Sequence, residues 1–234
     1  MSFKTRSYQK ELLDGKDVAF ADIRRNMQEL DFINTYLGGH SITLAGVKAL
    51  LRQRGGTKHI VEIGCGGGDN LRVIKEWADG KGIKVSLYGV DINPECIAFA
   101  ESRIENNGIA FHCSDYKTFH LVEPPDIIFS SLFCHHFSDE ELIYMMKWMQ
   151  QNTRIGFFIN DLHRHPLAYY SIKILTQIFS GSYMVKNDAP LSVKRGFRKV
   201  DWQKILTAAG IQSYHIKWKW AFRWLIIVPG KHAN

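Results

Sequence analysis

The stretch Val61-Glu62-Ile63-Gly64-Cys65-Gly66-Gly67-Gly68-Asp69 joins a short apolar run to the start of a helical pattern. Glycines let the backbone turn sharply and approach a ligand, and the first turn of the following helix offers free backbone donors. A dinucleotide loop of the form G-x-G-x-x-G needs a third glycine where this chain has Asp69, and no G-x-x-x-x-G-K-[ST] sequence occurs. The carboxylates of Glu62 and Asp69 would repel a pyrophosphate, so the stretch predicts a strand–loop–helix site for a positively charged ligand.

Short apolar runs alternate with helical patterns on the carboxyl side of this loop. The runs predict strands over residues 59–63, 84–90, 109–113, 126–133 and 154–160, with helices over residues 69–78, 95–106 and 139–151. Such alternation implies right-handed crossovers, so we expect an α/β, doubly wound, mostly parallel sheet. Two further strands, over residues 214–220 and 222–228, follow each other directly and predict a seven-stranded sheet with an antiparallel last strand.

Helical patterns also flank this core. They cover residues 17–39 and 43–54 before the first strand, and residues 200–209 before the last two strands. We therefore divide the chain into an N-terminal helical cap, residues 1–57, and a cofactor domain, residues 58–234. Residues 161–197 contain no strand-like run and carry a helical apolar spacing from Leu167 to Phe179. We expect them to form a helical insertion after the fifth strand that covers the acceptor site.

The glycine stretch and two later motifs together resemble the class I S-adenosylmethionine-dependent methyltransferases. The later motifs are Gly89-Val90-Asp91-Ile92-Asn93 and Cys113-Ser114-Asp115-Tyr116, which follow the second and third predicted strands. In open α/β sheets, ligands bind outside the carboxyl ends of the strands, where all three motifs fall. A second likeness, in residues 24–40 and 161–170, is to bacterial small-molecule methyltransferases, some of which modify polyketide or quinone-like aromatics.

The family resemblance implies S-adenosyl-L-methionine as cofactor and S-adenosyl-L-homocysteine as product. It implies that the glycine loop cradles the methionine part of the cofactor, that Asp91 holds the ribose hydroxyls, and that Asp115 accepts from the adenine amino group beside Ile92. The cofactor residues expected on this basis are Glu62, Gly64, Cys65, Gly66, Asp69, Asp91, Ile92, Ser114, Asp115, Tyr116 and Ser131. Asp91 has a second interpretation as the N-cap of the helix that begins near Pro94.

The end of the fourth predicted strand reads Ser131-Leu132-Phe133-Cys134-His135-His136. Family members that methylate amines, bases or glutamine commonly carry [DNS]-P-P-[YFW] there, so nitrogen methylation is disfavoured. Imidazole titrates near neutral pH, which makes His135 and His136 candidate catalytic bases. Neighbours in extended chain face opposite ways, so we expect at most one of them to face the acceptor. The cysteine and histidine spacings match no common zinc pattern, and we expect no metal.

The insertion supplies the residues that we expect to contact the acceptor: His163, Arg164, Tyr169, Tyr170 and Arg195. Its mixture of apolar and basic side chains fits a hydrophobic aromatic or acyl molecule, with a negative group or delivered by an acidic carrier protein. The transfer would be to oxygen or to carbon, between which the sequence does not choose.

Charge is unevenly distributed along the 234 residues. The net charge of +7 divides into +4 for residues 1–60, −7 for residues 61–150 and +10 for residues 151–234. An acidic cofactor half suits a cationic cofactor, and basic flanks suit an anionic small acceptor. The basic C-terminal third leaves RNA or protein methylation as the alternative, although no appended RNA-binding segment is visible and we expect no stable nucleic-acid complex.

Other classes of protein fit less well. A non-catalytic cofactor-binding protein would have damaged motifs, and a nicotinamide dehydrogenase would have the third glycine. Four cysteines without CxxC pairing, no apolar signal region and no run near the ~18 apolar residues of a membrane span predict a reduced, cytoplasmic protein without disulfides. The oligomeric state is left open.

Overall fold

The protein folds around one seven-stranded sheet in the order β3-β2-β1-β4-β5-β7-β6. The structure, a computed structural model, describes residues 3–15, 18–51 and 55–230. Its strands are β1 (Lys58–Ile63), β2 (Val85–Asp91), β3 (Ile109–Cys113), β4 (Ile127–Ser131), β5 (Gly156–Leu162), β6 (His215–Lys219) and β7 (Arg223–Pro229). This order, with its reversal between β1 and β4, confirms the predicted doubly wound sheet.

The last two strands form the predicted antiparallel ending. Strands β1 to β5 pair in parallel, whereas β7 inserts antiparallel between β5 and β6. The turn between β6 and β7 places Ala221 and Phe222 at φ 59° and 55°. Positive φ at two consecutive residues is unfavourable for side chains other than glycine, so tertiary contacts must hold this three-residue turn.

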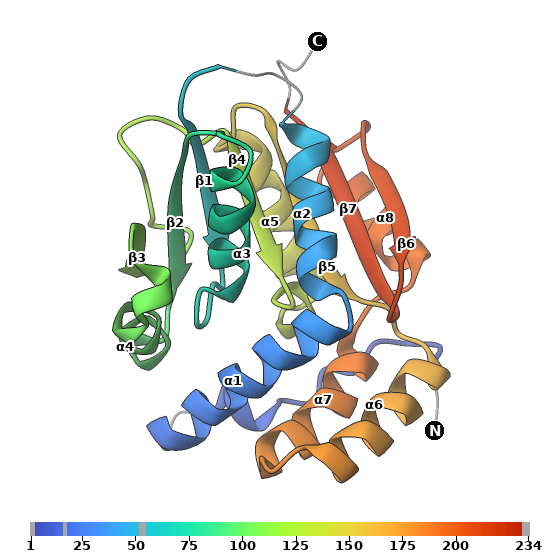
Figure 1. Cartoon of the computed structure of the whole chain (residues 1–234). Helices are drawn as coiled ribbons and strands as arrows, with labels where there is room; N and C mark the ends of the chain where they lie inside the picture. Colours follow the sequence, from blue (N-terminus) through green and yellow to red (C-terminus); the bar gives the residue numbers. More distant parts are fainter. Residues whose placement is uncertain (1–2, 16–17, 52–54, 231–234) are drawn as a thin grey trace.

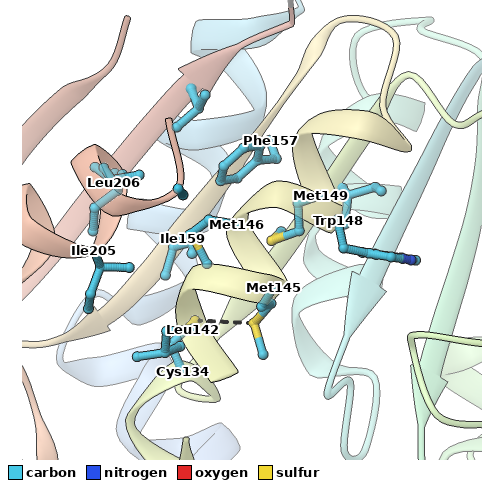
Figure 2. Packing of buried hydrophobic residues seen from close by; sticks show 14 of the residues in the cluster. Cys134, Leu142, Met145, Met146, Trp148, Met149, Phe157, Ile159, Ile205 and Leu206 are labelled. Carbon is cyan, nitrogen blue, oxygen red and sulfur yellow. Dashed lines mark hydrogen bonds between the residues drawn. The ribbon is translucent and has the colours of Figure 1, made fainter. Parts of the chain in front are cut away.

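Helices cover both faces of the sheet (Figure 1). One face carries α2 (Gly39–Leu50), α3 (Asp69–Asp79) and α4 (Pro94–Ser102), and the other carries α5 (Asp139–Gln151) and α8 (Lys199–Ala208). Figure 2 shows the second face, where methionines of α5 lie beside Phe157 and Ile159 of β5, and Cys134 Sγ is 4.0 Å from Met145 Sδ. Burial of both faces explains why the parallel strands read as continuous apolar runs.

Three more helices lie together beyond the carboxyl ends of the parallel strands (Figure 1). They are α1 (Phe20–Tyr36), α6 (Pro166–Phe179) and α7 (Tyr183–Arg195). Helix α2, by contrast, packs on β5 and β7 in the sheet's own helical layer. The cap that we propose over the site therefore consists of the segment before α2 together with α6 and α7.

The four cysteines are free thiols, three of them buried. Among the residues that the structure describes, none of the helices combines the length and the apolar character needed to cross a bilayer.

The close packing of α2 against the sheet depends on Gly46. A Cβ at this position would overlap the ring of Phe158, which is fully buried and stacked on Phe129 with centroids 4.8 Å apart. Glycine to alanine in a helix normally stabilises, but here the ring cannot move away. We expect Gly46→Ala to lower the free energy of unfolding by about 1–3 kcal/mol in urea denaturation.

A second substitution checks this cause. Adding Phe158→Leu to Gly46→Ala should recover part of the lost stability, because it removes the overlapping ring. Equal or greater stability of Gly46→Ala alone would show that the helix sits less tightly than described.

Candidate active site

The glycine loop turns at Gly64, directly after β1. Gly64 has φ +69°, and a Cβ there would overlap the ring of Phe133, so only glycine fits. The loop is tied to the end of β2, because the Gly66 amide donates to Asp91 Oδ2 at 3.0 Å. The other oxygen, Oδ1, accepts from the Asn93 amide at 2.9 Å, and Asn93 itself is the N-cap of α4. Asp91 therefore braces the loop and does not cap the helix.

Three carboxylates surround this loop. Glu62 is fully buried behind it, and burial, followed by the charges of Asp69 and Asp91, raises its pKa well above the usual value. Burial also raises the pKa of Asp91. Burial alone would raise the pKa of Asp69 as well, but His40, whose Nε2 lies 2.8 Å from Asp69 Oδ2, holds it below the usual value. The site thus gathers acidic groups that a cationic ligand would stabilise.

A buried polar chain links Glu62 to the end of β4. The Asn70 amide donates to Glu62 Oε1 at 3.0 Å, and the Thr43 hydroxyl donates to Asn70 Oδ1 at 2.9 Å. Asn160 Nδ2 then bridges Thr43 Oγ1 and Ser131 Oγ, both at 3.2 Å. This chain fixes the cofactor loop relative to α2, β4 and β5.

The residues expected to contact the adenine of the cofactor lie at the ends of β2 and β3. The Ser114 amide donates to the Asp91 carbonyl at 2.9 Å, and Asp115 Oδ1 accepts from the Lys117 amide at 3.0 Å. Ile92 is 69% exposed, so its side chain offers an uncovered apolar wall. Tyr116 instead packs in the core edge-on against Trp148.

These residues fit S-adenosylmethionine. Glu62 Oε2 is buried without a hydrogen-bond partner in the described part of the chain, so a positive charge at the loop would favour the ionised form of Glu62 and with it a negative potential behind the loop. An ammonium and a sulfonium would meet that potential, whereas a pyrophosphate would be repelled by it. Cys65 is buried and packs behind the loop beside Gly89, so it contributes shape and not charge.

A cavity of about 300 Å³ lies beside the loop, under the cap. Leu132, at the cavity, and Phe133, against Gly64, are consecutive residues, so the cavity and the loop lie on either side of one turn. Leu132 has φ 52°, an unfavourable conformation for leucine that is typical of functional sites. The apolar lining comes chiefly from Leu13, Leu30, Ile33, Leu37, Leu132, Leu162, Ala168, Ile172, Leu175, Val185, Ala189, Val193, Trp220, Ala221 and Phe222.

Both candidate bases line this cavity. Residues Cys134–His136 form a 3₁₀ turn and not extended chain, so the rings of His135 and His136 lie side by side with centroids 4.3 Å apart. The expectation that only one would face the acceptor site is therefore wrong. His135 Nδ1 lies 2.8 Å from Asp161 Oδ1, and His136 Nδ1 lies 2.8 Å from Asp14 Oδ1.

Each carboxylate fixes the orientation of its imidazole and turns Nε2 away from itself. His135 Nε2 lies 3.6 Å from Glu11 Oε1, and His136 Nε2 lies 4.0 Å from Glu11 Oε2. Burial alone would raise the pKa of Asp161, but the adjacent His135 holds it below the usual value. Burial raises the pKa of Glu11 to about 7. The arrangement can therefore accept or release a proton near neutral pH.

Arg195 supports this cluster from behind. Its guanidinium donates to the carbonyls of His135 and His136 at 3.0 and 2.9 Å and to Asp14 Oδ2 at 2.7 Å. Arg195 is buried and lies outside the cavity lining, so it positions the histidine turn.

The other acceptor residues expected from the sequence also lie outside the lining. Arg164 is 1% exposed and donates to the carbonyls of Phe3 and Gly196 and to Asp201. Tyr169 and Tyr170 sit on the sides of α6 that do not face the cavity; the lining face is Ala168, Ser171, Ile172 and Leu175. His163 accepts from the Trp218 indole, and burial lowers its pKa to about 4.

The cavity contains polar groups that sequence reasoning missed. Besides Glu11, they include Asp188, whose carboxylate accepts from the amides of Leu12 and Leu13 at 2.9 and 3.0 Å. Arg223 is buried, donates to Asn34 Oδ1 at 2.8 Å, and has its Nη1 without a partner in the described ranges. No local motif marks these residues, because they come from segments far apart in the chain.

Two groups of described side chains have the geometry to hold a metal ion. Glu11, His135 and His136 form one group, and Asp31, His40 and Asp69 form the other; within each, one ligand atom per residue lies within 4.8 Å of the others. In both groups the imidazoles already contact carboxylates. The absence of a metal from the reaction stays a prediction.

Comparison with known proteins agrees with this geometry. Residues 60–156, which span the glycine loop and the ends of β2, β3 and β4, match a family model described as a methyltransferase domain. The order of the strands matches the Rossmann-like methyltransferase fold, and the matched segment includes the acidic glycine loop. The matched segment and the fold support a class I S-adenosylmethionine-dependent methyltransferase.

Solved structures share the fold at low sequence identity. The plantazolicin methyltransferase BpumL, in complex with a monoazolic desmethylPZN analog and SAH, has a TM-score of 0.65 and 16% identity over 91% of this chain and 89% of its own. A SAM-dependent methyltransferase from Aquifex aeolicus has a TM-score of 0.62 and 14% identity over 91% and 99%.

Human N-acetylserotonin methyltransferase has a TM-score of 0.63 and 18% identity; the match covers 91% of this chain but only 56% of the human one. A comparison with curated protein sequences gave no match.

The raised pKa of Glu11 predicts a pH-dependent stability. The folded protein keeps the Glu11 proton up to about pH 7, whereas the unfolded chain releases it near its ordinary value of 4.5. Wild-type stability should therefore fall, through this group, as pH rises through that window. Glu11→Gln removes this titration. The free energy of unfolding of the variant minus that of the wild type should therefore increase by about 2 kcal/mol from pH 5 to pH 8.

Urea denaturation of both proteins at the two pH values measures this difference. A difference that does not change with pH would mean that Glu11 is already ionised in the folded protein at the lower pH.

Proposed function

We propose that the enzyme transfers a methyl group to an oxygen of a hydrophobic small molecule bound in the apolar cavity. The observation that carries this proposal is a mostly apolar cavity with two imidazoles, each held by a carboxylate, at the end nearest the cofactor loop. Such a cavity suits an aromatic or acyl molecule with one acidic hydroxyl. Its small volume disfavours RNA or a folded protein as the acceptor.

The cofactor is proposed to lie against the glycine loop. Gly64, Cys65 and Gly66 would shape the methionine end over Glu62, the Asp91 carboxylate would accept from the ribose hydroxyls, and Asp115 and Ile92 would hold the adenine. Bound S-adenosylmethionine supplies the methyl group and leaves as S-adenosylhomocysteine.

His135 is proposed to act as the base. Asp161 holds the proton on His135 Nδ1, which leaves the Nε2 lone pair directed toward the cavity and Glu11. As the acceptor oxygen attacks the methyl carbon, its proton moves to Nε2, and Asp161 stabilises the imidazolium that results. Glu11, which titrates near neutrality, can pass the proton on. The same base would serve an activated ring carbon beside a hydroxyl.

Arg223 is proposed to orient the acceptor. Its Nη1 has no partner among the residues that the structure describes, and a buried charged donor at the cavity costs free energy unless a ligand satisfies it. A carbonyl or carboxylate oxygen of the acceptor is the group that fits. The acceptor would therefore be an otherwise apolar molecule with one anionic or strongly polar substituent, which Arg223 binds.

Substitution of the histidines tests the proposed base. With an acceptor found by screening phenols and acyl compounds against radiolabelled methyl donor, His135→Gln should lower kcat by about 100-fold or more. Asp161→Asn, which acts through His135, should lower kcat and also change the pH dependence of kcat. Affinity for S-adenosylhomocysteine, measured by calorimetry, should stay within about twofold of wild type, because neither side chain reaches the loop. Near-normal turnover of His135→Gln would contradict the assignment, and a loss of turnover in His136→Gln alone would assign the base to His136 instead.

The role of Arg223 is tested by Arg223→Met. We expect KM for the acceptor to rise by about tenfold or more with little change in affinity for S-adenosylhomocysteine, since one charged hydrogen bond to the acceptor is lost. An equal loss of cofactor affinity would instead show that the oxygen bound by Nη1 belongs to the cofactor.

A further inference from the structure

Helix α6 is both apolar and exposed, a combination that a water-facing helix avoids. Its fourteen residues, Pro166–Phe179, include one charged side chain, Lys173, yet ten of them are exposed. Ile174, Ile178 and Phe179 are 59%, 66% and 78% exposed. A surface helix normally turns polar residues to solvent, and a large exposed apolar face marks an interaction surface.

The exposed side chains form one stripe. Leu167, Tyr170, Ile174 and Ile178 are spaced by three or four residues and so lie along one side of the helix, and all four are exposed. The buried residues Ala168, Tyr169 and Thr176 lie on the other side. The stripe is therefore presented outward by the way in which α6 packs on the protein.

This stripe runs into the mouth of the acceptor cavity. Leu175 is 40% exposed and also lines the cavity. Across the mouth, the turn between β6 and β7 contributes Trp220, which lines the cavity and is 73% exposed. The turn lies beside the start of α6, where the rings of His165 and Phe222 stack 5.2 Å apart (Figure 1). An apolar path thus leads from the outer surface to the candidate base.

Within residues 161–230 the exposed charges have one sign, although Glu29 of α1 lies at the end of α6, where it accepts from the Ser180 hydroxyl and the Gly181 amide. Residues 161–230 contain three acids, and each is engaged: Asp161 with His135, Asp188 with two backbone amides, and Asp201 with Arg164. The exposed charged side chains of this part of the chain are basic, among them Lys173 on α6 and Lys217 on β6. An apolar stripe with basic surroundings is complementary to an anionic lipid surface.

We propose that α6 is an interfacial helix that seats the enzyme on an anionic lipid bilayer, with the cavity mouth turned toward the hydrocarbon. Tyr170, Trp218 and Trp220 supply amphipathic rings of the kind that favour the interface. The bilayer is preferred to a protein partner because the stripe offers almost no polar group for a specific interface. The inference goes beyond the proposed reaction and implies that a lipid-soluble acceptor enters from the membrane.

Vesicle sedimentation of the full chain tests the proposal. Wild type should sediment with vesicles of phosphatidylcholine that contain a quarter phosphatidylglycerol and only weakly with pure phosphatidylcholine, and added salt should weaken binding. Ile174→Glu combined with Ile178→Glu should lower the partition coefficient by about tenfold or more, because two apolar side chains leave the interface and two negative charges enter it.

A matched control carries the same charge change elsewhere. Ile104→Glu combined with Val122→Glu alters two exposed apolar residues outside α6 and should sediment like wild type apart from a small charge effect. Calorimetric titration with S-adenosylhomocysteine should give the same affinity for all three proteins, which verifies folding and keeps this test separate from that of the methyltransferase reaction.

Three results would overturn the proposal. One is wild type that sediments with neither kind of vesicle, and another is equal loss of binding in the control and the α6 variant. The third is a dimer in size-exclusion chromatography that the α6 substitutions dissociate without any vesicle binding, which would assign the stripe to a second copy of the chain.

Discussion

The buried contact between Asp161 and His135 is the interaction around which the acceptor half of the protein is arranged. Asp161 is the next-to-last residue of β5 and is fully buried, so its negative charge requires a partner, and His135 provides it at 2.8 Å. Arg195 from α7 and Arg6 from the N-terminal segment both donate to the His135 carbonyl. The cap is thus anchored on the same turn that carries the proposed base, which links folding of the cap to assembly of the site.

The cofactor half is joined to this centre through neighbouring residues of two strands. Asn160, next to Asp161, connects through Thr43 and Asn70 to Glu62 behind the glycine loop. Leu132 and Phe133 place the cavity and the loop on either side of one turn. The acidic and basic parts of the sequence have separate places in this arrangement. Carboxylates gather at the cofactor loop, and the exposed charged side chains of residues 161–230 are basic.

Much of the fold could be predicted because it depends on local patterns. Buried parallel strands gave continuous apolar runs, and β3 and α5 have the predicted bounds, Ile109–Cys113 and Asp139–Gln151. The acceptor side could be predicted only in part. Glu11 and Arg223 reach the cavity through tertiary packing that no spacing encodes, and the 3₁₀ turn at His135 replaced an expected extended chain. Arg164 carries the charge expected of an acceptor residue, but its donors serve the backbone of the N-terminal segment and Gly196.

The central claim is that the acidic glycine loop is built for a cationic cofactor. Calorimetric titration of the full chain with S-adenosylhomocysteine and, separately, with NAD tests it most directly, with Asp91→Ala as the variant. The account predicts saturable binding of S-adenosylhomocysteine, weakened by about tenfold or more in Asp91→Ala, and no binding of NAD. Binding of NAD without binding of S-adenosylhomocysteine would contradict it.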